Sequence, residues 1–524
     1  MFWLGVIYPV GNLEKIFPAS TAIYSEISLN RASLKNLQAL FPDADITLLW
    51  SAISGDKFAF DFEKDIKPWV GSRAGIGVFG KGDFVVAVQY RNRAGAEKFL
   101  DHFRLPSEAF DISDAGGGEI WTPKFSSNFS FGFAKGYVFF ASSPARLKEV
   151  FEFKTNLRDS EAFNSIRSDL QGRGELFLFA DTQKALDILL MSGNLQAQKP
   201  MMEVLSQTLP ALGVRAKLDK TGIQLDSKIL TREGVFAGKR VERGENKTLP
   251  ELAQFASQNA LFFMNGADIH AKYLHTKEFL SSFHPQFAVV FDGVLRGLSR
   301  QIFGEKFDFE KDFLSQMHGQ YALILDFPDV LSPFVNFTLI TGFGEGDTEQ
   351  NISHLHDALR FAQGQFSAES REVKLPDGSM REELVAVPSQ ELPIKKKEFN
   401  GATYFTFDSP SDQNKKFSYG FLEGYFIFST HEDGLKSVIS AYGGENLAKN
   451  QDFRDSVLFR FSPSESYGFL NYTKLSSVFE LLGADKTEEN TVWSFFAHAN
   501  VRNLVFARKV FPSEIFWTAI LFKR

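Results

Sequence analysis

The sequence predicts an α+β protein built from two similar lobes, each a mainly antiparallel sheet with packed helices, that arose by tandem internal duplication. Two observations carry this prediction. The hexapeptide Phe-Asp-Phe-Glu-Lys-Asp occurs at residues 60–65 and again at residues 307–312, and such an identity indicates an internal repeat. In addition, strand-like runs follow one another through tight turns, which favours antiparallel pairing with helices packed on a face.

Longer stretches recur in the same order. Residues 129–140 (FSFGFAKGYVFF) match residues 417–428 (FSYGFLEGYFIF) at seven of twelve positions, and residues 177–190 correspond to residues 469–482. We expect the shared positions to be structural. The repeat motif comprises Phe60, Asp61, Phe62, Asp65, Trp69, Gly136, Tyr137, Phe307, Asp308, Phe309, Asp312, Gly424 and Tyr425.

The repeat also predicts where the lobes begin and end. The predicted parts are an apolar N-terminal segment at 1–17, a first lobe at 18–230, a linker at 231–254 and a second lobe at 255–524. The second lobe carries an inserted hairpin at about residues 364–398, because strand-like runs flank the turn signal Pro376-Asp377-Gly378. The basic run at 395–397 that follows is interpreted as a solvated loop.

Local patterns predict the elements of the first lobe. A turn and strand over 18–27 come first. Paired strands are predicted at 74–79 and 84–90, followed by a helix at 94–103. In the next hairpin, Gly136 stands where a tight turn needs positive φ. A helix then begins at Ser143 and Pro144, a cap followed by proline in the first turn.

The second lobe repeats these elements. Thr430 and Asp433 are predicted to form a capping box for the corresponding helix. Each lobe closes with a hairpin, and the predicted strands are 214–218 with 223–230 and 500–510 with 515–522.

Composition limits the classes of partner and chemistry. The formal net charge is −7 with no long basic block, so we expect no nucleic-acid partner. The chain has no cysteine, which excludes disulfides, thiolate metal sites and a cysteine nucleophile. It has 58 phenylalanines, which must lie in a core, an interface or an apolar ligand site.

One glycine-rich stretch has the glycine spacing of a nucleotide-binding loop. Residues 75–81 (GIGVFGK) satisfy the spacing G-x-G-x-x-G. A P-loop needs Ser or Thr after the lysine and a helix N-terminus beyond it, whereas Gly82 and a strand-like run follow here. We therefore predict a hairpin and no cofactor.

Two groups of residues are weak candidates for a metal site. Acidic side chains in both copies of the hexapeptide could bind calcium, but helix capping explains them better. A histidine pair at spacing i, i+2 on a predicted helix does not share a face. The sequence therefore predicts no catalytic, cofactor-binding or metal residues. The weak metal candidates are Asp61, Glu63, Asp65, Asp308, Glu310, Asp312, His354 and His356.

Residues 61–71, 136–147 and 375–378 resemble a bacterial family known only as a domain of unknown function, number thirty-three fifty-two. The resemblance spans nearly the whole chain. Members of that family commonly look like one N-terminal transmembrane helix followed by a large extracytoplasmic part. The resemblance implies an extracytoplasmic or cell-surface, membrane-associated protein, with residues 2–10 as the tail of a missing or truncated anchor; a cytoplasmic location stays open.

Three functions fit these observations. The leading hypothesis is a non-enzymatic extracytoplasmic scaffold or binding protein near a membrane, whose partner is an unknown protein or apolar ligand. The first alternative is a carrier of a lipid or other apolar ligand in a Phe-lined cavity. The second alternative is a hydrolase with paired carboxylates, which only proximity in three dimensions can establish.

Overall fold

The computed structural model describes most of the chain. The described residues are 13–29, 64, 67–101, 110–124, 129–170, 175–191, 199–219, 221–232, 250–304, 306–327, 335–344, 346–362, 366–374, 379–388, 394–409, 416–461, 464–481, 501–511 and 513–523. The predicted anchor remnant at 2–10 and the first hexapeptide, with Phe60, Asp61, Phe62, Glu63 and Asp65, lie outside these residues.

The chain forms two compact units. Unit 1 comprises residues 1–237, 486–501 and 510–524, and unit 2 comprises residues 238–485 and 502–509. In both units helices pack on an antiparallel sheet, so the protein is of the α+β class.

Unit 1 is built on an antiparallel sheet. Its described strands, in the order of their hydrogen-bonded neighbours, are β4 (Phe110–Ala115), β5 (Gly118–Pro123), β6 (Ser130–Ala134), β7 (Tyr137–Ala141), β3 (Asp83–Tyr90), β2 (Val70–Gly80), β1 (Ile23–Ser28), β8 (Leu176–Asp181), β9 (Ala211–Asp219), β10 (Gly222–Leu230) and β22 (Glu514–Lys523).

Tight turns join neighbouring strands of unit 1. β2 and β3 meet at the pair Gly80–Asp83, so the glycine-rich stretch is a hairpin, as predicted. Between β6 and β7, Lys135 and Gly136 have φ of 51° and 85°. This is the left-handed backbone of the two-residue turns that suit the twist of a hairpin.

Side chains of unit 1 alternate between the two faces of the sheet. On β3, Val85 and Ala87 face one core, and Val86 and Val88 face the other. Four helices, η1 (Leu13–Lys15), α4 (Pro144–Glu152), η4 (Leu157–Asp159) and α5 (Glu161–Asp169), contribute to the first core, and α3 (Arg93–Asp101) contributes to the second. The remaining described helices of unit 1 are α6 (Thr182–Leu190) and α7 (Lys199–Thr208).

Unit 2 is also built on an antiparallel sheet, and its strands follow the same order as those of unit 1. In the order of their neighbours they are β16 (Lys395–Phe399), β17 (Ala402–Asp408), β18 (Lys416–Leu422), β19 (Tyr425–Ser429), β13 (Asn336–Phe343), β12 (Met317–Asp326), β11 (Phe262–Gly266), β20 (Ser466–Asn471) and β21 (Val501–Phe511).

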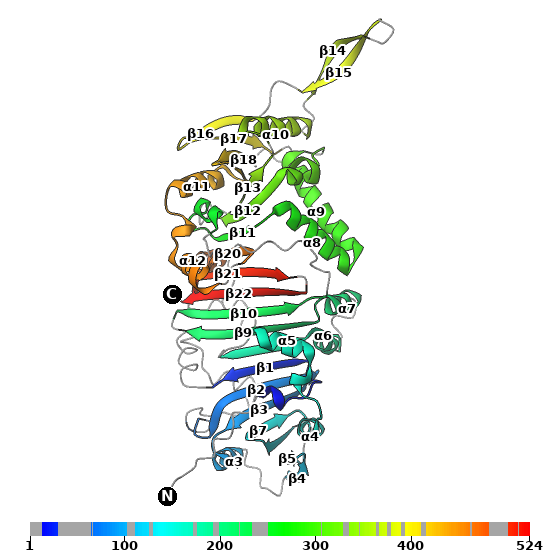
Figure 1. Ribbon diagram of the computed structural model, residues 1–524, viewed down its shortest axis with the longest axis vertical. Helices are drawn as coiled ribbons and strands as arrows, with labels where there is room; N and C mark the ends of the chain where they lie inside the picture. Colours follow the sequence, from blue (N-terminus) through cyan, green and yellow to red (C-terminus); the bar gives the residue numbers. More distant parts are fainter. Residues whose placement is uncertain are drawn as a thin grey trace. The chain divides into compact units, whose positions relative to one another are not determined.

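The helices of unit 2 surround an aromatic core. Phenylalanines dominate this core: the ring centroids of Phe303 and Phe307, for example, lie 4.3 Å apart. The helices are η6 (Glu251–Phe255), α8 (Ile269–Phe283), α9 (Pro285–Phe303), η7 (Phe309–Phe313), η8 (Leu314–Gln316), α10 (Thr348–Ala362), α11 (Glu432–Gly443), η9 (Leu447–Lys449), α12 (Gln451–Asp455), η10 (Ser456–Arg460) and α13 (Tyr472–Leu481). The long helices α8 and α9 follow each other directly and pack together (Figure 1).

Two local predictions for the second lobe are wrong. The basic run at 395–397 is not a loop but part of β16, where Lys397 Nζ lies 2.6 Å from Glu432 Oε2 and so gains an ion pair. Thr430 and Asp433 form no capping box, because α11 begins one residue later than predicted. Its N-cap is His431, while Thr430 Oγ1 accepts the backbone N–H of Phe337.

The region of the predicted insert contains a hairpin of its own. Strands β14 (Phe366–Lys374) and β15 (Met380–Pro388) pair with each other in a separate two-stranded sheet. Both strands are longer than the sequence pattern indicates.

Candidate functional site

The acidic residues of the second hexapeptide form a helix cap. Asp308 Oδ1 accepts the backbone N–H groups of Glu310 and Lys311, each at 3.1 Å. Asp312 Oδ2 in turn accepts the N–H of Asp308 at 2.9 Å. Within the part of the chain that the structure describes, no three His, Asp or Glu side chains are grouped so that they could hold a metal ion.

The two histidines of α10 lie in different surroundings. His354 is exposed. His356 is half-buried and packs edge-on against Phe405 and Tyr419, with ring centroids 5.0 and 5.9 Å away. Burial lowers the pKa of His356. The structure therefore does not bring these two rings together at one site.

Other residues of the repeat motif occupy turns and cores. Gly136 and Gly424 have φ of 85° and 80°, which favours glycine. Trp69, Tyr137 and Phe307 are buried, at 3%, 3% and 4% exposure. Each of these five side chains or turns thus has a position that packing or backbone geometry explains.

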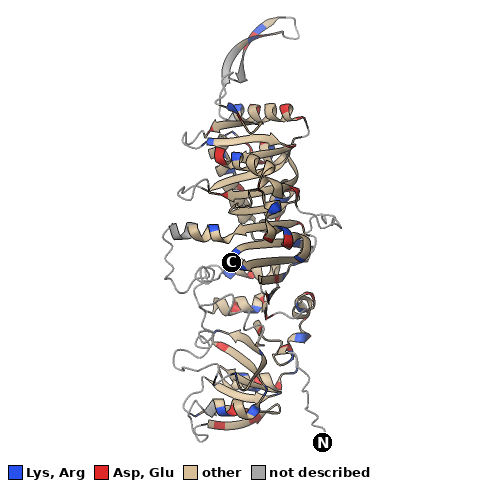
Figure 2. Cartoon of the chain, turned by 90° about the vertical axis from the view of Figure 1, so that its left-hand side faces the viewer, with Lys and Arg blue, Asp and Glu red and all other residues tan. Residues whose placement is uncertain are grey.

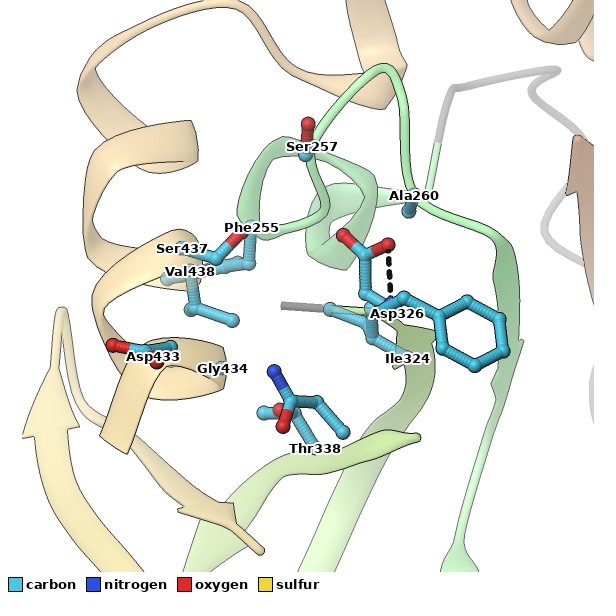
Figure 3. Close-up of a pocket in the computed structure, with 12 residues that line it drawn as sticks. Phe255, Ser257, Ala260, Ile324, Asp326, Thr338, Asp433, Gly434, Ser437 and Val438 are labelled. Atoms are coloured by element: carbon cyan, nitrogen blue, oxygen red, sulfur yellow. Dashed lines mark hydrogen bonds between the residues drawn. The ribbon is translucent and has the colours of Figure 1, made fainter. Parts of the chain in front are cut away.

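A pocket of about 140 Å³ lies within unit 2 (Figure 3). It is enclosed by η6, the end of β12, the start of β13 and the first turns of α11. Its lining residues are Phe255, Ser257, Ala260, Ile324, Asp326, Phe327, Asn336, Thr338, Asp433, Gly434, Ser437 and Val438.

The polar groups of this pocket are two carboxylates, one amide and three hydroxyls, which include donors as well as acceptors. Asn336 is 3% exposed, and its Oδ1 has no hydrogen-bond partner among the described residues. The Asp326 carboxylate is ion-paired with Lys474 and accepts the Phe327 N–H at 2.9 Å. Asp433 adds a second carboxylate, and no lysine, arginine or histidine is among the lining residues.

Matching hydrogen bonds identify the equivalent place in unit 1. The Phe84 N–H donates to Ser142 Oγ at 3.2 Å, and in unit 2 the Phe337 N–H donates to Thr430 Oγ1 at 3.0 Å. In both units the bond joins the third strand to the residue before the N-cap of the helix. Asp83 therefore corresponds to Asn336 of the pocket.

An arginine fills this place in unit 1. Arg146, four residues after Ser142, donates from Nε to both carboxylate oxygens of Asp83 at 3.1 Å. It also pairs with Glu149, and its Cζ lies 4.3 Å from the ring centroid of Phe79. Burial works against the Asp83 carboxylate, but hydrogen bonds from Arg146 and Ser142 outweigh it and hold the pKa of Asp83 below its usual value.

Unit 2 has no side chain in that place. Gly434, four residues after Thr430, corresponds to Arg146, and by the same spacing Ser437 corresponds to Glu149. A Cβ at Gly434 would lie 2.3 Å from Ser429 Oγ and 2.9 Å from Thr338 Oγ1, so the surroundings demand glycine. The pocket thus lies beside a glycine at the position where unit 1 has Arg146.

Sequence reasoning missed this pocket. The signal was present, because residues 129–140 and 417–428 align the two copies and place Arg146 opposite Gly434. A glycine in one stretch aligned with a large charged side chain in the other would have indicated a space there.

A second feature is the exposed surface of α9. Five large apolar side chains there are exposed, at fractions from 37% to 70%: Phe287, Val289, Val290, Val294 and Leu298. Basic and acidic residues are otherwise interspersed on the helices and strands of both units (Figure 2). Among the described helices, none is long and apolar enough to cross a membrane.

Comparison with known proteins gives a family but no function. No curated protein sequence matches the chain. The chain is similar to solved structures of TP0453. Crystal form I gives a TM-score of 0.25 at 10% identity, covering 43% of this chain and 80% of that one, and form III gives 0.25 at 8% identity, covering 46% and 83%. A family model described as "Protein of unknown function (DUF3352)" matches residues 53–498, and the chain belongs to that family.

Proposed function

We propose that the protein is a non-enzymatic extracytoplasmic scaffold or binding protein that attaches to an anionic membrane surface through α9. The observation that carries this proposal is the exposed apolar face of α9. A helix of 19 residues normally buries its apolar side chains, yet Val289, Val290 and Val294 are 70%, 61% and 56% exposed.

The apolar residues of α9 form two opposite faces. Ala288, Ser299 and Phe303 are buried against the unit. Val290 and Val294 are four residues apart and therefore lie together on the outer side of the helix, away from this buried face. A helix with one face on its own domain and a second apolar face in solvent needs a second apolar surface to cover it.

The charges of α8 and α9 favour a lipid surface as the partner that covers the exposed apolar face of α9. The chain has a net charge of −7. Helices α8 and α9 instead carry four basic residues and two acidic ones, and Arg296 and Arg300 of α9 are exposed. Basic residues beside an exposed apolar face are typical of helices that lie in the interface of an anionic bilayer.

Membership of the family supports the location. Its members commonly look membrane-anchored and extracytoplasmic, so an interfacial helix would hold unit 2 against the same membrane. A membrane anchor and an interfacial helix together bind a membrane more tightly than either does alone.

Vesicle sedimentation tests this proposal. We expect the full chain to sediment with phosphatidylglycerol–phosphatidylcholine vesicles and less with phosphatidylcholine alone. The variant Val290→Asp/Val294→Asp should bind at least about tenfold more weakly, because two apolar side chains lose their burial in lipid. The matched control is Ile112→Asp, which changes a 53% exposed apolar residue of unit 1.

Two results would contradict the proposal. One is no sedimentation of the wild-type chain with anionic vesicles. The other is equal sedimentation of the Val290→Asp/Val294→Asp variant and the Ile112→Asp control, which would separate membrane binding from α9.

The described residues give little support to the hypothesis that the protein carries an apolar ligand. The pocket of unit 2 has about 140 Å³, below the several hundred Å³ of typical ligand sites. Core phenylalanines pack on one another instead of lining a space: the centroids of Phe139 and Phe151, for example, are 5.1 Å apart.

The hydrolase with paired carboxylates is the second candidate, because Asp326 and Asp433 line the same pocket. Asp326 is engaged by Lys474, which leaves Asp433 as the carboxylate available for proton transfer. A hydrolytic activity of the purified chain that Asp433→Asn abolishes would support this candidate, and equal activity in both would remove it.

We also infer that the two units arose by tandem duplication. Their common strand order supports this inference, as does a matching pair of isolated bridges, Pro18–Asn156 and Ser257–Asn446. The lobe boundaries at 18–230 and 255–524 remain predictions.

A further inference from the structure

We propose that the protein binds a second copy of itself, by pairing strand β4 of one copy with strand β16 of the other, edge to edge. Among the described strands, β4 pairs only with β5 and β16 pairs only with β17. Each therefore has one edge with unpaired N–H and C=O groups, to which another strand can add. Helix α9 belongs to neither edge, so the proposal does not rest on membrane binding.

The turns of the two hairpins determine which backbone groups face outwards. The residues of both turns have φ between 48° and 81°: Gly116 and Gly117 in β4–β5, and Asn400 and Gly401 in β16–β17. A two-residue turn of this kind is flanked by a hydrogen-bonded pair, so the groups of every second residue point away from the hairpin. The outward groups include those of Ile112, Asp114, Lys396 and Glu398.

The two edges carry opposite charges. Asp111 and Asp114 of β4 are exposed, and only Asp111 has a described ion-pair partner, Lys124, whose Nζ lies 3.9 Å from Asp111 Oδ1. Lys395 and Lys396 of β16 are exposed and make no ion pair within the described part of the chain. Two like edges would bring equal charges together, which is unfavourable, whereas β4 against β16 brings acids beside bases. The charges therefore favour the unlike pair of edges.

One antiparallel register satisfies both the backbone groups and the charges. It pairs Ile112 with Glu398 and Asp114 with Lys396, and each pair exchanges two hydrogen bonds. Directly opposite side chains lie on the same face, which puts the Asp114 carboxylate beside the Lys396 ammonium group. The added strand also covers part of the Ile112 side chain, which is 53% exposed in the single chain.

This contact joins two different surfaces, because one copy offers β4 and the other offers β16. Each copy keeps a free edge of the other kind, so further copies can add or a ring can close. The strands have only six and five residues. Such short strands bury little surface, and we therefore expect weak association that depends on protein concentration.

Analytical ultracentrifugation of the full chain tests the proposal. We expect the weight-average mass of the wild type to rise above that of one chain as the protein concentration increases. Asp111→Lys/Asp114→Lys makes β4 basic, and Lys395→Glu/Lys396→Glu makes β16 acidic. Each double variant should associate about tenfold more weakly or less, because like charges then face each other.

The two charge-reversed variants also provide a rescue experiment. In an equimolar mixture, the basic β4 of one variant meets the acidic β16 of the other, so association should return towards the wild-type level. The matched control is Glu152→Lys/Glu203→Lys, which reverses two exposed acidic residues on helices of unit 1 and should associate like the wild type. Circular dichroism checks that each variant is folded.

Disulfide cross-linking tests the register, because the chain has no cysteine of its own. In the proposed register Ser113 and Lys397 form a pair without hydrogen bonds, in which the side chains come closest. A mixture of Ser113→Cys and Lys397→Cys chains should form disulfide-linked dimers under mild oxidation. Either variant alone should form few, since like edges do not pair.

Four outcomes would overturn the proposal. The first is a wild-type mass of one chain at every protein concentration. The second is equal association of the charge-reversed variants and the control. The third is a mixture of the two charge-reversed variants that associates no more than its components. The fourth is cross-linking that is no stronger in the mixture of cysteine variants than in either variant alone.

Discussion

The space beside the third strand of the sheet is occupied differently in unit 1 and in unit 2. In unit 1 the space beside the third strand holds Arg146, which is bound by Asp83 and Glu149. In unit 2 the same space is a pocket, with Gly434 where the arginine would begin. Two sheets with the same strand order thus differ in whether an internal cation is present.

The difference teaches that two sheets with the same strand order can share a hydrogen bond and still differ in the side chain beside it. The Thr430 hydroxyl accepts the Phe337 N–H as the Ser142 hydroxyl accepts the Phe84 N–H, and Asn336 stands where unit 1 has Asp83. Asp83 is bound by Arg146, whereas Asn336 Oδ1 is buried without a hydrogen-bond partner among the described residues, which is costly.

Removing the arginine of unit 1 should have the largest effect on stability. Arg146→Ala leaves Asp83 and Glu149 without their shared partner, and we expect a loss of about 3 kcal/mol in the free energy of unfolding. Urea denaturation measures the change. Lys148→Ala, at an exposed position of the same helix, should change stability by less than about 0.5 kcal/mol. Equal effects of both substitutions would refute the role of Arg146.

The first residues of α4 and α11 give a second comparison, in which the stability of the protein depends on pH. Unit 1 has Pro144 there, and unit 2 has Glu432. Burial disfavours the Glu432 carboxylate, but hydrogen bonds from Lys397, Lys436 and Tyr404 outweigh this and lower its pKa to about 2.

A carboxyl group whose pKa falls on folding stabilises the protein above its unfolded pKa, which for glutamate is 4.5. We expect Glu432→Gln to cost about 1.5 kcal/mol at pH 7, less than the full shift would give because solvent screens a partly exposed group. The difference from wild type should shrink as the pH falls from 4.5 towards 2. Unfolding curves at several pH values check this, and a difference independent of pH would contradict it.

The helix caps give the smallest expected difference. Ser143 accepts the Arg146 N–H at 3.2 Å, whereas the side chain of His431 makes no capping bond. Ser143→Ala should therefore cost about 1 kcal/mol. His431→Ala should cost less than about 0.5 kcal/mol. Thermal unfolding of both variants measures the two losses of stability. A larger loss of stability for His431→Ala than for Ser143→Ala would contradict the assignment of the caps.

The sequence predicts much of the sheet but little of the pocket. Hairpin β6–β7 could be predicted because Gly136 stands at a turn that needs positive φ, and α4 because Ser143 and Pro144 begin it in a preferred way. Turn chemistry and caps act over a few residues, so local sequence reveals them.

Features that depend on distant residues could not be predicted in this way. Helix α9 was missed because its apolar residues occupy two faces instead of the single stripe that indicates a surface helix. The pocket joins Asp326, Asn336 and Asp433 from three separate elements, and nothing local distinguishes these from ordinary polar residues. Pairing of β22 with β10, which are far apart in the sequence, is likewise set by tertiary structure.

The most direct test of the comparison is a crystal structure of the full chain. We predict that the Arg146 guanidinium of unit 1 lies within about 3 Å of the Asp83 carboxylate, and that no protein side chain fills the pocket beside Gly434 in unit 2. An Arg146 side chain turned away from Asp83, or a side chain that fills the pocket of unit 2, would contradict the account.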